Sequence, residues 1–169
     1  MANLLNNYQQ KEVNKEDYFK VLLNYSHSQT RILASGKQVP WIDENLNPYT
    51  GEWLSRKRLS TWENGNWSAE KGGVERGKDY NHSTFCDLVI SGLIGLRPCE
   101  GNTFMVNPLV PAGAWDYFCL DNIFYHGRLV TILYDRTGKH YHKGNGLQVF
   151  VNGKRKASAA ELRKLEIKI

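Results

Sequence analysis

Two adjacent carboxylates, Asp43 and Glu44, are the residues of this sequence best suited to chemistry. They lie in the segment 39–53, VPWIDENLNPYTGEW, between Trp41 and the turn-forming residues 47–51. Sugars offer hydroxyl groups to carboxylates and flat C–H faces to indole or phenol rings. A turn that holds acids beside an aromatic ring therefore predicts a carbohydrate site.

The two adjacent acids do not form an acid–base pair. Inverting glycoside hydrolysis uses two carboxyl groups about 6.5–9.5 Å apart, one to protonate the leaving oxygen and one to activate water. Neighbouring side chains such as Asp43 and Glu44 commonly diverge, so they are poor candidates for both roles. Asp116 and Asp121 lie on predicted strands, where edge or turn roles are expected. No convincing general acid is found in the sequence.

Further polar and aromatic side chains invite a functional interpretation. Trp41 could stack on a sugar ring, and Tyr80 and His82 could hydrogen-bond hydroxyl groups beside the following helix. Structural alternatives stay open, since Trp41 could cover packed helices and His82 could cap a helix. The pair His140 and His142 has no third ligand type nearby, which favours a solvated hairpin over a metal site.

Composition indicates a packed globular protein without a resident cofactor. Hydrophobic residues make up 41% and charged residues 23% of the 169 residues. The net charge is +5, and basic residues cluster locally in two short runs, 56–58 and 154–156, which lack interleaved aromatics, so nucleic acid is not an expected partner. No glycine-rich phosphate cradle is present, and no cofactor or metal is expected.

Cysteine usage and hydropathy bear on the cellular compartment. The three cysteines, Cys86, Cys99 and Cys119, have no CxxC spacing, and we expect reduced, buried side chains. Neither a signal peptide nor a membrane span is recognised, which predicts a protein without membrane partners in the cytoplasm.

Helical patterns occupy the first half of the chain. Residues 1–13 are polar and expected to be flexible, and Asn14 is a candidate N-cap for a helix of about six turns that ends at Gly36. Residues 37–81 are expected to form a long loop. A second apolar stripe follows Ser83 and is closed by Pro98, and Gly92 and Gly95 within it predict a close approach of another backbone.

Strand patterns occupy the second half. From Thr103 onward the apolar period changes to two, with strand-like segments at 103–107, 115–120, 123–126, 128–135, 147–152 and 162–169. Asn152-Gly153 is a strong hairpin turn. Helices followed by strands predict an α+β fold, with a helical region at 14–98 and an antiparallel β-sandwich at 99–169.

Three of these segments, taken in order, resemble the C-terminal end of the six-hairpin glycosidases. The first is the turn 44–51, ENLNPYTG; the second is 80–85, YNHSTF, leading into the last helix; the third is 107–111, NPLVP, with the aromatic strand 115–118 after it. Among these enzymes the chain is most similar to the group of mannosyl-oligosaccharide glucosidase and mannosylglycerate hydrolase, and more distantly to trehalase and the maltose-phosphorylase type. The resemblance covers about residues 15–150.

The resemblance implies a fold and a set of roles. It implies that the two helices are the last of an α/α toroid and that a β-sandwich follows them. It implies that Glu44 is the catalytic general base, with Trp41, Asp43, Tyr80 and His82 around the substrate. A toroid needs about twelve helices, and two are recognised here; most of the barrel and the general acid are not.

The sequence therefore leaves two classes of function open. In the first, the chain is part of an inverting glycoside hydrolase for α-linked sugars and is inactive alone, either as a fragment or as a subunit that completes a separately encoded barrel portion. In the second, it is a non-catalytic β-sandwich that binds carbohydrate or protein. Apolar helix faces without barrel neighbours also predict a homo-oligomer.

Overall fold

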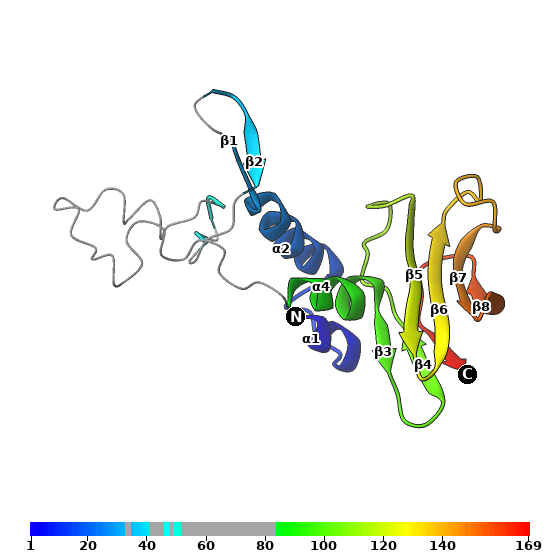
Figure 1. The fold of residues 1–169 in the computed structure, drawn as a ribbon. Coiled ribbons are helices and arrows are strands. Elements are labelled where there is room, and N and C mark those ends of the chain that lie inside the picture. Colours follow the sequence, from blue (N-terminus) through cyan, green and yellow to red (C-terminus); the bar gives the residue numbers. More distant parts are fainter. Residues whose placement is uncertain (33–34, 41–45, 48, 52–83) are drawn as a thin grey trace, which may run out of the picture. The chain divides into compact units, whose positions relative to one another are not determined.

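The structure is a computed structural model that describes residues 1–32, 35–40, 46–47, 49–51 and 84–169 (Figure 1). The chain divides into two compact units. Unit 1 combines residues 1–19 with 84–169, and unit 2 consists of residues 20–83. Unit 1 is therefore discontinuous in sequence, and helix α2, Lys15–Ser28, begins in unit 1 and continues into unit 2.

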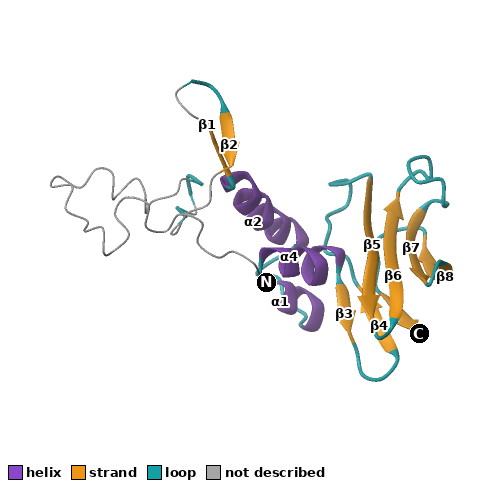
Figure 2. Cartoon of the chain, in the orientation of Figure 1, coloured by secondary structure: helices purple, strands orange, loops and turns teal. Residues whose placement is uncertain are grey.

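Unit 1 contains two antiparallel sheets (Figure 2). The three-stranded sheet has the order β3-β4-β9, with bounds Leu96–Pro98, Thr103–Val106 and Leu165–Lys168. The four-stranded sheet has the order β5-β6-β7-β8, with bounds Tyr117–Tyr125, Arg128–Asp135, Gly146–Val151 and Lys154–Ala159. The predicted α+β class and the antiparallel strands after residue 99 are confirmed.

The core of unit 1 lies between these sheets. Phe104 of β4 is fully buried, and its ring meets that of Tyr125 of β5 at 5.5 Å between centroids. Alternate residues of β6 and β7 supply further buried side chains: Val130, Ile132, Tyr134, Leu147, Val149 and Val151. This period of two places one face of each strand inward, as the sequence pattern predicted.

Tight turns connect β5 to β6 and β7 to β8 in the larger sheet. Asn152 and Gly153 have φ values of 48° and 75° and join β7 to β8, so the predicted hairpin is confirmed. His126 and Gly127 join β5 to β6 with φ values of 46° and 73°. Strand β8 was not predicted, because its sequence KRKASA lacks apolar alternation; exposed Lys and Arg are typical of the edge strand that it forms.

Helix α2 is shorter than predicted. Its start is confirmed, since Asn14 Oδ1 accepts the Asp17 N–H at 2.8 Å and Asp17 Oδ2 accepts the Asn14 N–H at 2.9 Å. The predicted extension to Gly36 is wrong, because the chain turns after Ser28 into strand β1, Thr30–Ile32, which pairs with β2, Gln38–Pro40. The apolar period of this stretch fits a strand as well as a helix, and Gly36 serves as a hairpin residue with φ 80°.

The second predicted helix is an α-turn followed by a π-helix. It comprises α4, Phe85–Asp87, and η3, Leu88–Ile94, and it ends at Gly95 in the left-handed conformation, φ 82°. Pro98, which was expected to close the helix, instead lies in β3 at the edge of the smaller sheet, where a missing N–H is tolerated. A short helix α1, Ala2–Asn7, lies in the segment for which a flexible N-terminus was predicted. None of the described helices is long and apolar enough to cross a membrane.

Candidate functional site

The residues proposed for the sugar site lie outside the described part of the chain. These are Trp41, Asp43, Glu44, Tyr80 and His82. Their roles therefore remain predictions. What the structure does describe is the turn that follows Glu44, the segment that fixes the last helix, and a group of aromatic side chains on the larger sheet.

The predicted turn at 47–51 is confirmed at its described residues. The side-chain oxygen of Asn47 accepts the N–H groups of Tyr49 and Thr50 at 2.9 and 3.2 Å. The Asn47 carbonyl accepts the Gly51 N–H at 2.9 Å, and Gly51 has φ 70°. Asn47 and Gly51 thus have the turn roles that their residue types indicated, while the ring of Tyr49 is 95% exposed.

The motif 107–111 holds the helical elements of unit 1 against its sheets. Asn107 and Leu109 donate their backbone N–H groups to the carbonyls of Gly95 and Leu93, both at 2.9 Å. The Pro108 carbonyl accepts a hydrogen bond from Lys15 Nζ at 3.0 Å, at the start of α2. The motif therefore links η3 and α2 through backbone groups, which is a structural role.

The same motif fixes α1. The Asn107 amide donates to Asn6 Oδ1 at 2.5 Å, and Arg97 of β3 donates to Asn3 Oδ1 at 3.3 Å. The two contacts, Asn107 with Asn6 and Arg97 with Asn3, join residues about a hundred positions apart and give the N-terminal residues a fixed place in unit 1.

The pKa of the Lys15 ammonium is lowered by burial, although the charge of Glu16 opposes this effect.

Gly95 has the packing role that was predicted, whereas at Gly92 the close neighbour is a side chain and not the expected backbone. A Cβ at Gly95 would lie 2.1 Å from the backbone oxygen of Asn107, so another backbone does approach closely. A Cβ at Gly92 would meet the hydroxyl of Tyr18 at 1.9 Å, so a side chain takes the space there. The Tyr18 hydroxyl donates to the Leu88 carbonyl at 2.8 Å and secures α2 on η3.

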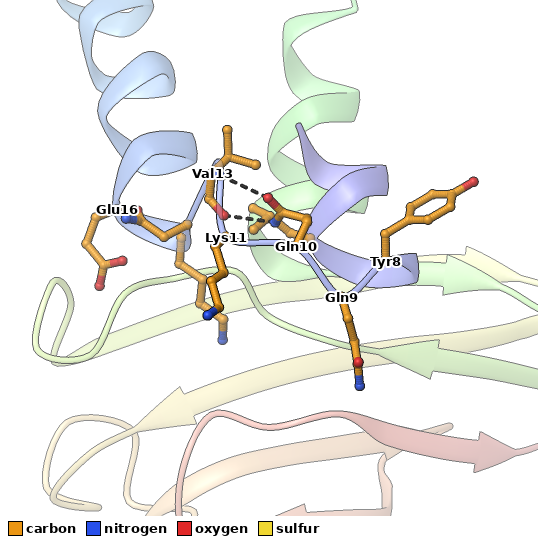
Figure 3. A pocket seen from close by; sticks show the side chains of 9 residues that line it. Tyr8, Gln9, Gln10, Lys11, Val13 and Glu16 are labelled. Atoms are coloured by element: carbon orange, nitrogen blue, oxygen red, sulfur yellow. Dashed lines mark hydrogen bonds between the residues drawn. The ribbon is translucent and has the colours of Figure 1, made fainter.

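An open hollow borders the segment that joins α1 to α2 (Figure 3). Gln10 is one of its lining residues, and the Gln10 Oε1 accepts the N–H groups of Glu12 and Val13 at 2.9 and 3.0 Å. Gln10 Nε2 donates to the Val13 carbonyl at 2.9 Å, as the dashed lines in Figure 3 show. The side-chain amide of Gln10 stabilises the turn between α1 and α2 and is not free to bind a ligand, so we assign this hollow a structural role.

A buried carboxylate organises the connection between β6 and β7. Asp135 is 1% exposed, and its Oδ1 accepts the N–H groups of Thr137 and Gly138 at 3.2 and 2.8 Å. Its Oδ2 accepts those of His140 and Tyr141, both at 2.8 Å. Burial opposes ionisation, but the four backbone donors outweigh it and lower the pKa of Asp135 below the ordinary value.

Three aromatic rings lie together at this connection and form what we call the aromatic platform: Tyr117, His140 and Tyr141. The rings of Tyr117 and His140 stack with centroids 3.5 Å apart and an interplanar angle of 9°. Tyr141 meets both edge-on, at 5.9 and 4.6 Å. Sequence reasoning missed the platform because Tyr117 lies more than twenty residues before His140 and Tyr141; the available signal was an Asp at the start of the loop.

The remaining candidate residues, Asp116, Asp121 and His142, are exposed. Asp116 pairs with Arg136 at 2.8 Å on the exposed surface, and Asp121 accepts hydrogen bonds from Asn122 and Thr131 at a bulge in β5. His142 lies exposed in the β6–β7 connection, and among the described residues no group of three or more His, Cys, Asp and Glu side chains is suited to a metal.

The expectation that the cysteines are buried is wrong. Cys86 and Cys119 are exposed and Cys99 is half-buried, and all three are free. Cys86 and Cys119 lie on the outward sides of their helix and strand, where the packing of the core does not require an apolar residue.

Comparison with known proteins supports a relation to glycoside hydrolases. Residues 96–157 match the family described as glycosyl hydrolase family 65, C-terminal domain. A solved structure named a sialidase is similar to the chain with a TM-score of 0.77 and 44% sequence identity, over 99% of this chain and 14% of that chain. This chain thus spans a small part of that relative's length. Its C-terminal region is similar to the C-terminal domain of family 65 glycosyl hydrolases, and the chain as a whole is similar to one segment of a larger glycosidase.

Proposed function

We propose that this chain forms the C-terminal portion of a glycoside hydrolase that cleaves α-linked sugars with inversion. In this proposal Glu44 is the general base, Trp41, Asp43, Tyr80 and His82 surround the sugar, and the general acid comes from a helical portion elsewhere in the protein or from a separately encoded chain. The observation that carries the proposal is the position of the family 65 match. The match begins at residue 96, directly after the last helix ends at Gly95. The β-domain therefore follows the last helix directly, which is the order of segments in the resemblance to six-hairpin glycosidases.

The second support is that the similarity to the sialidase is not confined to the sheets. It extends over 99% of this chain, and therefore includes the turn at 47–51 and the helices as well as the β-domain. The name sialidase applies to that relative and is not transferred to this chain. The class of sugar proposed here comes from the motif resemblance alone.

The third support is the exposed apolar surface on the helices. In unit 1, Leu4 and Tyr8 of the α1 region and Leu88 of η3 are 45%, 67% and 46% exposed. Apolar side chains on helices normally pack against neighbours. We propose that further helices of the glycosidase cover them, and that the isolated chain self-associates through them at tens of micromolar, which sedimentation would detect.

The test is a calorimetric titration of the purified chain with α-linked di- and trisaccharides, with product assayed in the same tubes. We expect binding without turnover in the wild type and at least about tenfold weaker binding in Glu44→Gln, because a hydrogen bond to a charged group contributes about 1.5–3 kcal/mol. Glu12→Gln, at an exposed position in unit 1, is the matched control. Equal binding by all three proteins would exclude Glu44 from the sugar site.

A second experiment tests the supply of the acid. The chain is mixed with the helical portion of a related glycosidase, and hydrolysis and the anomer released are followed by NMR. We expect hydrolysis with inversion only in the mixture, and its loss with Glu44→Gln. Hydrolysis with retention would contradict the proposed mechanism.

A further inference from the structure

We propose that the aromatic platform is a second, non-catalytic binding site for the sugar chain on which the glycosidase acts. The inference rests on the proposed function for the class of ligand, an α-linked oligosaccharide. It is separate from the proposed catalytic residues in sequence, since the platform lies at the start of β5 and in the β6–β7 connection.

The first argument is the exposure of stacked rings. Tyr117 is 48% exposed although it belongs to a strand, and His140 is also exposed. Because the two rings lie face to face, each covers one side of the other and retains one outer side. A pyranose C–H face packs on an aromatic ring of this kind, while the phenol and imidazole edges offer hydrogen bonds to hydroxyl groups.

The second argument is preorganisation. An isolated surface tyrosine loses side-chain entropy when it binds a ligand, which weakens binding. Here the backbone of both His140 and Tyr141 is fixed by the carboxylate of Asp135, and Tyr141 contacts both stacked rings edge-on. The platform is therefore held in one arrangement before any ligand arrives.

The third argument is that the rest of the connection is also fixed by buried side chains. Gln148 of β7 is 1% exposed, and its amide donates to the Gly144 carbonyl at 2.8 Å while accepting from Arg155 at 3.4 Å. At the other end, the ion pair of Arg136 with Asp116 and the hydrogen bond from Arg136 N to the Asp116 carbonyl tie the loop to β5. The buried side chains of Asp135 and Gln148 therefore fix a loop that a simple connection between strands would not need to hold rigid. A binding surface does need a rigid support.

The experiment measures binding of the whole chain to an array of α-linked glucosides and mannosides, from disaccharides to heptasaccharides, followed by titration of the best binder. We expect Tyr117→Ala to weaken binding about tenfold and Tyr117→Phe to preserve it within about twofold, since the phenylalanine ring still stacks. Phe124→Ala removes another exposed aromatic ring, 75% exposed and outside the platform, and should have no effect. Thermal melts of each variant confirm that the fold is intact.

The outcomes separate this inference from the proposed function. Binding that depends on Tyr117 and not on Glu44 supports the platform, whereas binding that depends only on Glu44 supports the catalytic assignment and refutes the platform. If no sugar on the array binds with dependence on Tyr117, the inference is refuted. It is also refuted if Tyr117→Ala converts an oligomer into a monomer without changing sugar binding, because the platform is then an interface between copies.

Discussion

Substitution of Gly95 by alanine should be among the most damaging single changes in unit 1. Gly95 has φ 82°, and a left-handed conformation costs a residue with a Cβ about 1–2 kcal/mol. The new Cβ would also lie 2.1 and 2.3 Å from the carbonyl oxygen and carbon of Asn107, and backbone atoms cannot move aside by changing a rotamer.

Relief of that overlap must separate η3 from the motif 107–111. The two backbone hydrogen bonds between them, from Asn107 to Gly95 and from Leu109 to Leu93, would then be lost. Each contributes about 0.5–1.5 kcal/mol net. Together with the conformational cost, we expect Gly95→Ala to lower the free energy of unfolding by about 3–4 kcal/mol.

Urea unfolding followed by circular dichroism measures this loss. With a slope of about 1–2 kcal/mol per molar urea, the midpoint should fall by about 2 M. Gly101→Ala is the matched control, because Gly101 also has a positive φ of 66° but has no atom within 4 Å of the added Cβ. It should lose only the conformational part, about 1–2 kcal/mol. If the two variants lose equal stability, the close approach of Asn107 does not hold the helix, and the reasoning is refuted.

Three other substitutions test separate contacts of unit 1. Tyr18→Phe removes the hydrogen bond to the Leu88 carbonyl and should cost about 1 kcal/mol in urea titrations, whereas Tyr8→Phe, at an exposed ring, should cost nothing measurable. Asn14→Ala removes the cap of α2 and should cost about 1 kcal/mol, with reduced helical circular dichroism; an unchanged midpoint would contradict the capping role. The folded-state pKa of Asp135 is lowered, so its ionisation stabilises the fold at neutral pH and this contribution is lost as pH falls below its ordinary value of 3.8. Thermal midpoints of wild type should therefore fall more steeply with acidification below about pH 4 than those of Asp135→Asn, and parallel curves would show that the carboxylate does not stabilise the loop.

Local residue chemistry predicted the elements whose signals are strong and short-range. The cap at Asn14, the hairpin at Asn152-Gly153 and the alternation of β6 depend on neighbouring residues, and all three are confirmed. Gly95 was also interpretable, because a glycine within an apolar helix has few explanations other than close packing.

The errors have a common physical cause. Each segment is compatible with two local structures, and tertiary contacts outside the segment determine which one forms. The stretch after Ser28 has a helical period, yet it pairs as a hairpin of three residues on each side. Pro98 is a helix breaker by type, yet the helix has already ended at Gly95 and the proline occupies an edge strand. In both places the tertiary partner determines the outcome, and its identity is not present in the segment itself.

The candidate sites differ in how far a sequence can predict them. Asp43 and Glu44 could be proposed as candidates because the chemistry of adjacent acids in a turn is visible in one segment. The stack of Tyr117 on His140 was not, because it arises from the register that pairs Tyr117 with Asp135 and from the loop folded over that carboxylate. A single sequence does not specify strand register well enough to bring two such residues together.

The discontinuity of unit 1 has a consequence for its synthesis on the ribosome. Asn3 and Asn6 hydrogen-bond to Arg97 and Asn107, which follow them by 94 and 101 positions. At about 5–20 residues per second, roughly 5–20 s pass before those partners are made. Helix α1 therefore has no fixed place in unit 1 until the start of the β-domain has been made.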